Sequence, residues 1–340
     1  MGALARPHGR MTGMSAPIAL LVLIASLLQA TMPTPPPEAP IEIAPNTFLI
    51  RATPMPGRGP DGNTVIIDAP DGLIVVDTGR HASHSDAILA FATERKRPIA
   101  VILNTHWHLD HASGNGRVKA AHPKARIYTT TAIDKVLAPG GFLARNLEDA
   151  KKTLANTTDP VRRDEIQIFI ATMETRSELR PDEPLTASGP MQLAGRPLDV
   201  RVTDRAVSDA DVWLFDKATR VAVIGDLVTV PVPYFETACP ERWRASLDEV
   251  WATPFDTAIP GHGRPMTRAQ FDSYRQAFGA FVGCVQSSAA PAQCSSGWVE
   301  GIGSLIGDDP ERRRAIAANA DYYVGYLRTN GGKAPDCTAK

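Results

Sequence analysis

Short apolar runs separated by turn residues fill the chain from about residue 41 onward. The pattern predicts strands at 46–52, 64–69 and 73–77, which are rich in β-branched and large apolar side chains. A Pro-Asp-Gly tripeptide occupies 70–72. Because proline fixes φ and glycine accepts a positive φ, this tripeptide predicts a turn, and residues 64–77 a hairpin.

Helical patterns alternate with further strands along the rest of the chain. Residues 83–96 suit a helix, and a charged helical pattern runs from about 141 to 183. Asp309 before Pro310 predicts a helix start, because proline at the first helical position loses no hydrogen bond. Further strands are predicted at 99–104, 126–130, 198–203, 212–215, 221–224 and 257–259, and the last helix aligns Ile316, Ala320, Tyr323 and Leu327 on one face. This alternation predicts an α/β protein with helices covering its sheets.

The first forty residues follow a different pattern. Arg6 and Arg10 precede a nearly unbroken apolar run at 16–30, which is typical of a secretory signal peptide. The run is shorter than the roughly 20 residues that cross a membrane. We therefore expect cleavage near Ala30 and an exported protein, periplasmic or secreted, without stable membrane association; an uncleaved anchor is the alternative. The proline-rich residues 31–40 predict a stiff linker.

Composition narrows the class of protein. The chain has 340 residues, 43% of them hydrophobic, and a formal net charge of -1. That is enough apolar sequence for a sizeable globular core. The charge balance argues against a dedicated nucleic-acid binder, which normally carries a basic excess.

The four cysteines lie late in the chain, and none forms a C-x-x-C pair. In an exported protein they predict two disulfides. A Cys284–Cys294 bridge would close a small loop, and a Cys239–Cys337 bridge would tie the carboxyl tail to the body. The sequence leaves all three pairings open, and buried free thiols as well.

The candidate metal-binding residues lie directly after the apolar strand 99–104. His106, His108, Asp110 and His111 form the pattern H-x-H-x-D-H in a chain with only 8 histidines. His106 and His108, two residues apart in extended chain, point to the same side. Imidazole and carboxylate are donors that zinc prefers, although iron and manganese also accept them. The motif therefore predicts a metal site at the carboxyl end of this strand.

The motif and three other segments resemble the metallo-β-lactamase superfamily of metallohydrolases. Val-Asp-Thr-Gly at 76–79, Gly-Asp at 225–226 and Pro-Gly-His-Gly at 260–263 follow that family's order. The resemblance covers roughly residues 42–270. It implies a four-layered αββα sandwich of two mixed β-sheets flanked by helices.

The resemblance also assigns roles to residues. It implies that Asp226 bridges two metal ions, that His262 supplies the last metal-binding imidazole, and that Asp77 supports the site from behind the ligands. Asp110, His111 and His262, with Asp226, form one complete site, where we expect one zinc ion.

A second ion would need His106, His108 and Asp226. The family usually adds a histidine at the position where this chain has Val207, and valine has no donor atom. We therefore expect the second ion to bind weakly or not at all, with two ions as the alternative.

Each of three other residues near the predicted site has two alternative roles. His81 and His84 follow the Asp-Thr-Gly turn, and they either replace the missing ligand or lie on the surface at a helix start. Arg205 has no lone pair to give a metal. In extended chain it would share a side with position 207 and bind a substrate carboxylate; otherwise it pairs with a neighbouring aspartate.

The mechanism implied is hydrolysis by a water that the metal activates, with Asp110 as the catalytic residue that orients or deprotonates this water. We expect the loop 54–62 to form a flap, the segment 141–183 to form a lid, and Trp107 to be a cleft wall or a packing residue. The predicted function is an exported zinc-dependent hydrolase of small acyl substrates, namely β-lactams, lactones or esters. The alternative is a metal-poor binding protein, catalytically weak, that retains the fold.

The expected parts are a signal peptide at 1–30, a linker at 31–40, a metallo-β-lactamase-like domain at 41–280 with a helical insert at about 141–190, and a helical extension at 281–340. The expected partner is a small-molecule substrate. The oligomeric state stays open.

Overall fold

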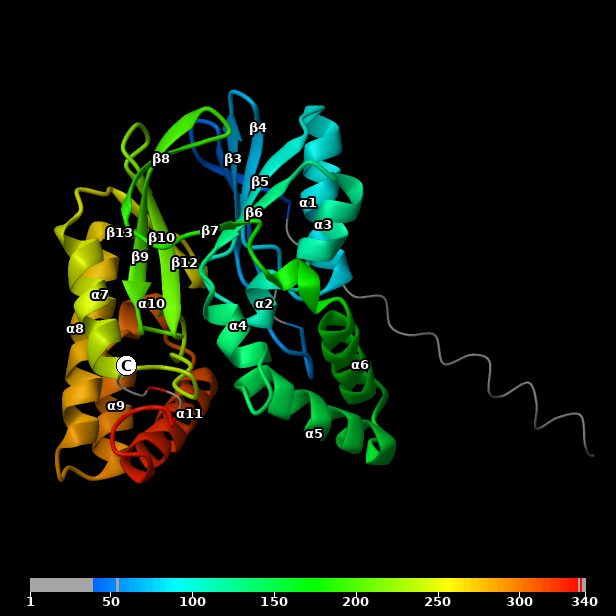
Figure 1. Ribbon diagram of the computed structural model, residues 1–340. Helices are drawn as coiled ribbons and strands as arrows, with labels where there is room; N and C mark the ends of the chain where they lie inside the picture. The colour runs from blue at the N-terminus through cyan, green and yellow to red at the C-terminus, as the bar shows by residue number, and fades with distance from the viewer. Residues whose placement is uncertain (1–38, 53–54, 336, 338–340) are drawn as a thin grey trace, which may run out of the picture. The chain divides into compact units, whose positions relative to one another are not determined.

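Two mixed β-sheets form the centre of the protein, as the computed structural model in Figure 1 shows. The structure describes residues 39–52, 55–335 and 337. The predicted signal peptide and nearly all of the predicted linker lie outside these residues. None of the helices in the described part of the chain is both long and apolar enough to cross a bilayer.

The first sheet has the strand order β1-β2-β3-β4-β5-β6-β7. Its strands are β1 (Ile41–Ala44), β2 (Thr47–Ile50), β3 (Thr64–Ala69), β4 (Gly72–Val76), β5 (Ile99–Leu103), β6 (Arg126–Thr129) and β7 (Glu183–Pro184). Strands β1 to β4 are antiparallel, and the predicted hairpin joins β3 to β4. From β4 to β7 the strands are parallel, because helices such as α1 (Ala82–Arg95) and α3 (Asn115–Ala121) carry the chain back between them.

The second sheet has the order β13-β12-β11-β10-β9-β8. Its strands are β8 (Gly189–Leu193), β9 (Arg196–Asp204), β10 (Ala210–Asp216), β11 (Val221–Thr229), β12 (Thr257–His262) and β13 (Met266–Thr267). All neighbours are antiparallel except β11 and β12, which helix α7 (Pro240–Ala252) connects. The carboxyl ends of β11 and β12 therefore meet at one edge.

Three apolar clusters hold the layers together. One lies between the two sheets and includes Val76, Leu103 and Ile259. A second joins the first sheet to α1 and α3, and a third joins the second sheet to the helices α7, α8 (Arg268–Gln286), α9 (Pro291–Gly301) and α11 (Pro310–Thr329). Figure 1 shows these helices on the outer sides of the two sheets. The predicted architecture of two mixed sheets flanked by helices is confirmed.

The predicted helical segment between the sheets packs on its own small core. It contains α4 (Ala132–Leu137), α5 (Phe142–Asn156), α6 (Pro160–Glu174) and the 3-10 helix η1 (Arg176–Leu179). Their apolar side chains enclose Trp107 and the short helix α2 (Leu109–Ala112), which carries the end of the histidine motif. Trp107 is 5% exposed. It is a packing residue that lies next to the site.

The carboxyl-terminal helices are secured by two disulfides. Cys284–Cys294 joins α8 to α9, and Cys239–Cys337 joins the start of α7 to the tail beyond α11. Helix α11 begins at Pro310, and the Asp309 side chain accepts a hydrogen bond from the Arg312 amide as a cap. A further short helix, α10 (Gly303–Ile306), precedes it. Residue 280, the predicted end of the domain, lies inside α8.

Candidate metal centre

The site lies at the edge where β4, β5, β11 and β12 end. The histidine motif follows β5, Asp77 follows β4, Asp226 lies in β11 and His262 is the last residue of β12. Carboxyl ends of parallel strands meet at one edge of each sheet, and the two sheets bring these edges together. The amide of Val212 in β10 donates to the Thr105 carbonyl across the two sheets, at 2.6 Å.

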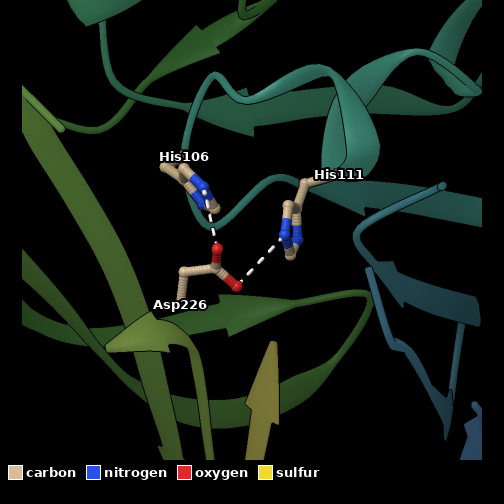
Figure 2. Close-up of side chains that lie close together, drawn as sticks. All are labelled: His106, His111 and Asp226. Atoms are coloured by element: carbon tan, nitrogen blue, oxygen red, sulfur yellow. Dashed lines mark ion pairs between the residues drawn. The ribbon is translucent and has the colours of Figure 1, made fainter. Parts of the chain in front are cut away.

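One group of donors consists of His106, His111 and Asp226. Their ligand atoms all lie within 4.8 Å of one another. His111 Nε2 is 3.2 Å from Asp226 Oδ1, and His106 Nε2 is 3.8 Å from Asp226 Oδ2. Figure 2 shows the carboxylate lying between the two imidazoles. This arrangement offers three convergent lone pairs to a cation.

A second group consists of Asp110, His111 and His262. Their ligand atoms also lie within 4.8 Å of one another. His262 Nε2 is 3.1 Å from Asp110 Oδ2 and 3.3 Å from His111 Nε2. Asp226 Oδ1 lies 3.5 Å from His262 Nε2, so Asp226 contacts both groups. The structure thus brings together five of the predicted ligands.

Asp77 and Thr105 orient two of these imidazoles. Asp77 Oδ2 is 2.7 Å from both the Thr105 hydroxyl and His111 Nδ1, so it accepts a hydrogen bond from each. The Thr105 hydroxyl gives its one proton to Asp77 and therefore accepts from His106 Nδ1, at 3.0 Å. Both imidazoles then carry a proton on Nδ1, so Nε2, which faces Asp226, is the atom of each ring that would bind a metal.

Two buried atoms of the site have no hydrogen-bond partner among the described residues. They are His106 Nε2 and Asp226 Oδ1. A buried acceptor without a partner costs about 1–3 kcal/mol. Histidine nitrogen and carboxylate oxygen are ligands of zinc, and a divalent cation would satisfy both atoms. The residues present therefore fit a metal ion.

Electrostatics set the protonation of the site. Burial lowers the pKa of His106 well below its ordinary value and that of His108 to about 4. Burial acts on His111 and His262 in the same way, but nearby carboxylates outweigh it and raise the pKa of both. Burial also opposes ionisation of Asp226, yet these imidazoles hold its pKa below the ordinary range. A cation entering the site displaces protons from His111 and His262.

Glycines leave room for the ligands. A Cβ at Gly261 would overlap Asp226 Oδ1, and a Cβ at Gly62 would overlap the His111 ring. Gly261 belongs to the Pro-Gly-His-Gly segment, so its role follows from the motif. Gly62 was not predicted as a site residue, although the loop 54–62 that contains it was predicted to form a flap.

His108 lies outside both groups. Its ring centroid is 4.3 Å from that of His106, but its Nε2 is 2.9 Å from the hydroxyl of Thr237. Val207 is 1% exposed and packs in the apolar cluster of the second sheet. Thr237 was not predicted, because no sequence pattern links it to the histidine motif.

His81 and His84 belong to neither donor group, and they do not lie on the surface. They are 3% and 2% exposed, so the expectation of surface histidines is wrong. His81 contacts Asp61 through Nδ1 and Glu165 through Nε2, both at 2.9 Å. Burial opposes its charge, but these carboxylates raise the pKa of His81 to about 9. The imidazolium has no lone pair for a metal. His84 Nε2 contacts the Thr64 hydroxyl at 2.8 Å.

Arg205 pairs with a neighbouring aspartate, which is the second of its two predicted roles. Its φ is +55°, so the chain there is not extended, and its Nε is 3.1 Å from Asp204 Oδ2. A different arginine borders the site. The Nε of Arg80 is buried without a hydrogen-bond partner among the described residues, and its charge helps to keep the pKa of Asp110 low against the effect of burial.

The predicted flap contacts the predicted lid. Arg58 Nη1 lies 2.5 Å from Asp164 Oδ2 and 2.9 Å from Glu165 Oε1, both on α6. The Gly59 amide donates to Glu165 Oε2 at 2.9 Å. The amide of Gly62 in the same loop donates to the Asp110 carbonyl at 2.8 Å. This loop therefore joins α6 to the metal-site motif.

Comparisons with known proteins agree with this geometry. A family model described as the metallo-beta-lactamase superfamily matches residues 57–262. A linear primary-alkylsulfatase of Pseudomonas sp. is 27% identical over 231 residues, which are 59% of this chain and 41% of that protein. An (R)-specific secondary-alkylsulfatase of Pseudomonas sp. is 32% identical over 105 residues, which are 30% of this chain and 14% of that protein. The chain spans less than half the length of these relatives.

Solved structures share the fold at low sequence identity. A metallo-beta-lactamase from Pontibacter korlensis matches with a TM-score of 0.52 and 15% identity over 71% of this chain and 98% of its own. The inverting sec-alkylsulfatase Pisa1 from Pseudomonas sp. matches with a TM-score of 0.58 and 14% identity over 85% of this chain and 50% of its own.

Proposed function

The chain belongs to the metallo-β-lactamase superfamily, and we propose that it is a metal-dependent hydrolase of small organic molecules. The observation that carries this proposal is the meeting of three imidazoles and two carboxylates at one edge, where His106 Nε2 and Asp226 Oδ1 have no hydrogen-bond partner among the described residues. The predicted metal is zinc, and the donor set also suits iron or manganese.

We assign the tighter ion to Asp110, His111 and His262, with Asp226 beside them. A second ion between His106 and Asp226 has fewer protein donors, because Val207 offers none. When bound, the metal supplies a water of lowered pKa and polarises the bond to be cleaved.

Residues of the chain itself have the remaining roles in the proposed hydrolysis. Asp110 Oδ2 faces His262 Nε2, and we assign to the Asp110 carboxylate the roles of holding the attacking water and taking its proton. Asp77 keeps the His111 ring in place. The water oxygen bonds to the acyl carbon, the bond to the leaving group breaks, and the leaving group receives the proton that Asp110 took from the water.

The proposed substrates are small acyl compounds, namely β-lactams, lactones or esters. Sulfate esters are a second candidate, because both curated relatives are named alkylsulfatases and because Arg80 Nε, near Asp110, has no hydrogen-bond partner in the described part of the chain. A guanidinium binds an oxyanion through paired hydrogen bonds. Export to the periplasm or the medium remains a proposal from the leader alone.

The test is metal analysis of the purified chain together with a panel of one ester, one lactone, one β-lactam and one alkyl sulfate. We expect about one equivalent of metal and hydrolysis of at least one compound. His262→Ala should abolish that hydrolysis, and the matched control His122→Ala should not, since His122 lies outside the site. A chain without zinc, iron or manganese and without hydrolysis would refute the enzyme and favour the binding-protein alternative.

Arg80→Met separates the two substrate classes. For an alkyl sulfate we expect KM to rise about tenfold or more, and for an uncharged lactone we expect little change. Equal effects on both substrates would remove the argument for sulfate esters.

A further inference from the structure

A hydrogen-bonded chain links His108 to the backbone of Val207. His108 Nε2 lies 2.9 Å from Thr237 Oγ1, and Thr237 Oγ1 lies 2.8 Å from the Val207 carbonyl oxygen. His108 is 8% exposed, Thr237 7% and Val207 1%, so little water competes for these contacts. The link connects the first sheet's histidine motif with the second sheet.

The direction of each hydrogen bond follows from the chemistry of the groups. A carbonyl oxygen only accepts, so the single hydroxyl proton of Thr237 goes to Val207. The hydroxyl oxygen can then only accept from His108, which places the imidazole proton on Nε2. We propose that Thr237 is a positioning residue that fixes the tautomer of His108 and leaves its lone pair on Nδ1, the one nitrogen of this ring that can then bind a metal ion. This inference rests on the proposed metal-dependent function.

The Val207 end of the link is rigid. The amides of Ala206, Val207 and Ser208 all donate to Asp211 Oδ2, at 3.1–3.2 Å. This cap fixes the peptide planes around the accepting carbonyl. Val207 therefore serves the site through its backbone, at the position where the family usually supplies a histidine side chain.

The Thr237 end is held from both sides. The Cys239 amide donates to the Ala206 carbonyl at 2.9 Å, and the Ala334 amide donates to the Ala238 carbonyl at 3.0 Å. The disulfide Cys239–Cys337 closes two residues after Thr237. The carboxyl tail thus secures the segment that orients His108.

The first experiment locates the proton on His108. In the metal-free protein labelled with nitrogen-15 on histidine, the spectrum at pH 7 should show His108 with a protonated Nε2 and a bare Nδ1. In Thr237→Val this preference should weaken, and in Thr237→Ser, which keeps the hydroxyl, it should remain. A His108 that carries its proton on Nδ1 in the wild type overturns the proposal.

The second experiment measures metal affinity by competition with a chelator, using zinc. Thr237→Val should weaken binding of the second equivalent about 10- to 100-fold and leave the first unchanged, whereas Thr237→Ser should resemble the wild type. The matched control is Thr203→Val, because Thr203 is 5% exposed and its hydroxyl has no partner among the described residues. Equal affinity in Thr237→Val and wild type overturns the proposal.

The two experiments separate this inference from the proposed function. A wild-type chain that binds no zinc refutes the metal-dependent function, while the nitrogen-15 spectrum still decides how Thr237 sets the His108 tautomer. If Thr237→Val does not fold, the wild-type spectrum and the Thr237→Ser affinity still decide the proposal.

Discussion

Replacing His81 by glutamine is expected to remove a pH-dependent part of the folding free energy. His81 lies at the start of α1, and its two ring nitrogens contact Asp61 in the flap and Glu165 on α6. Arg58 contacts the same Glu165. His81 therefore joins three segments next to the metal site with one buried charge.

The magnitude follows from the raised pKa. The pKa of His81 is about 9 in the folded protein and ordinarily 6.5, a difference worth on the order of 3 kcal/mol. Because the folded pKa is the higher one, the stabilisation is fully present below pH 6.5. It falls as the pH rises through 9. Glu165, whose pKa these contacts lower to about 2 against the effect of burial, keeps its charge throughout this range.

The assay is urea unfolding at pH 6 and at pH 9 for the wild type and His81→Gln. Between these values the wild type should lose about 3 kcal/mol more of its unfolding free energy than the variant. His122→Gln is the matched control, because His122 is a half-buried histidine outside this network. If the wild type and His81→Gln lose the same free energy, the assignment of a buried charge to His81 is wrong.

Asp77→Asn should lower zinc affinity about 10- to 100-fold in a chelator competition, because the amide no longer holds His111 with a charge. Gly62→Ala should lower the bound metal measured by mass spectrometry, since the new Cβ displaces the His111 ring. Removing Cys239–Cys337, which closes 98 residues, should lower the unfolding free energy in urea more than removing Cys284–Cys294, which closes 10, by about 4.7 against about 2.7 kcal/mol. Chelation should lower the melting temperature measured by calorimetry, and by more when more metal was bound.

The strands and the metal-binding motif could be predicted because their signals are local. Apolar runs such as 99–104 predict buried strands wherever they occur, and the histidine motif follows one directly. Helix α8 buries Phe271, Tyr274 and Phe278 on one face, and this spacing of three or four residues is also a local signal. The polarity of His81 suggested the surface, but Asp61 and Glu165 compensate its burial. Those partners come from distant parts of the chain.

The role of Thr237 also could not be predicted from the local sequence. Its function depends on meeting His108, which is 129 residues away in the sequence. A threonine between Glu236 and Ala238 belongs to no motif, and only the assembled sheets reveal its partner. Local sequence signals do not report which distant segments meet in the fold.

The division of the donors between the two sheets makes the metal centre a product of late folding. His111 and His262 lie 151 residues apart, and Asp226 belongs to the same sheet as His262. Closing so long a loop costs entropy before any donor gains a partner, so we expect these contacts to form after each sheet has paired its own strands. A nascent chain that has emerged only through β10 would hold the histidine motif without Asp226 or His262. Metal binding would then report that folding is complete, because a chain can bind the ion with all its donors only after its two sheets have packed together.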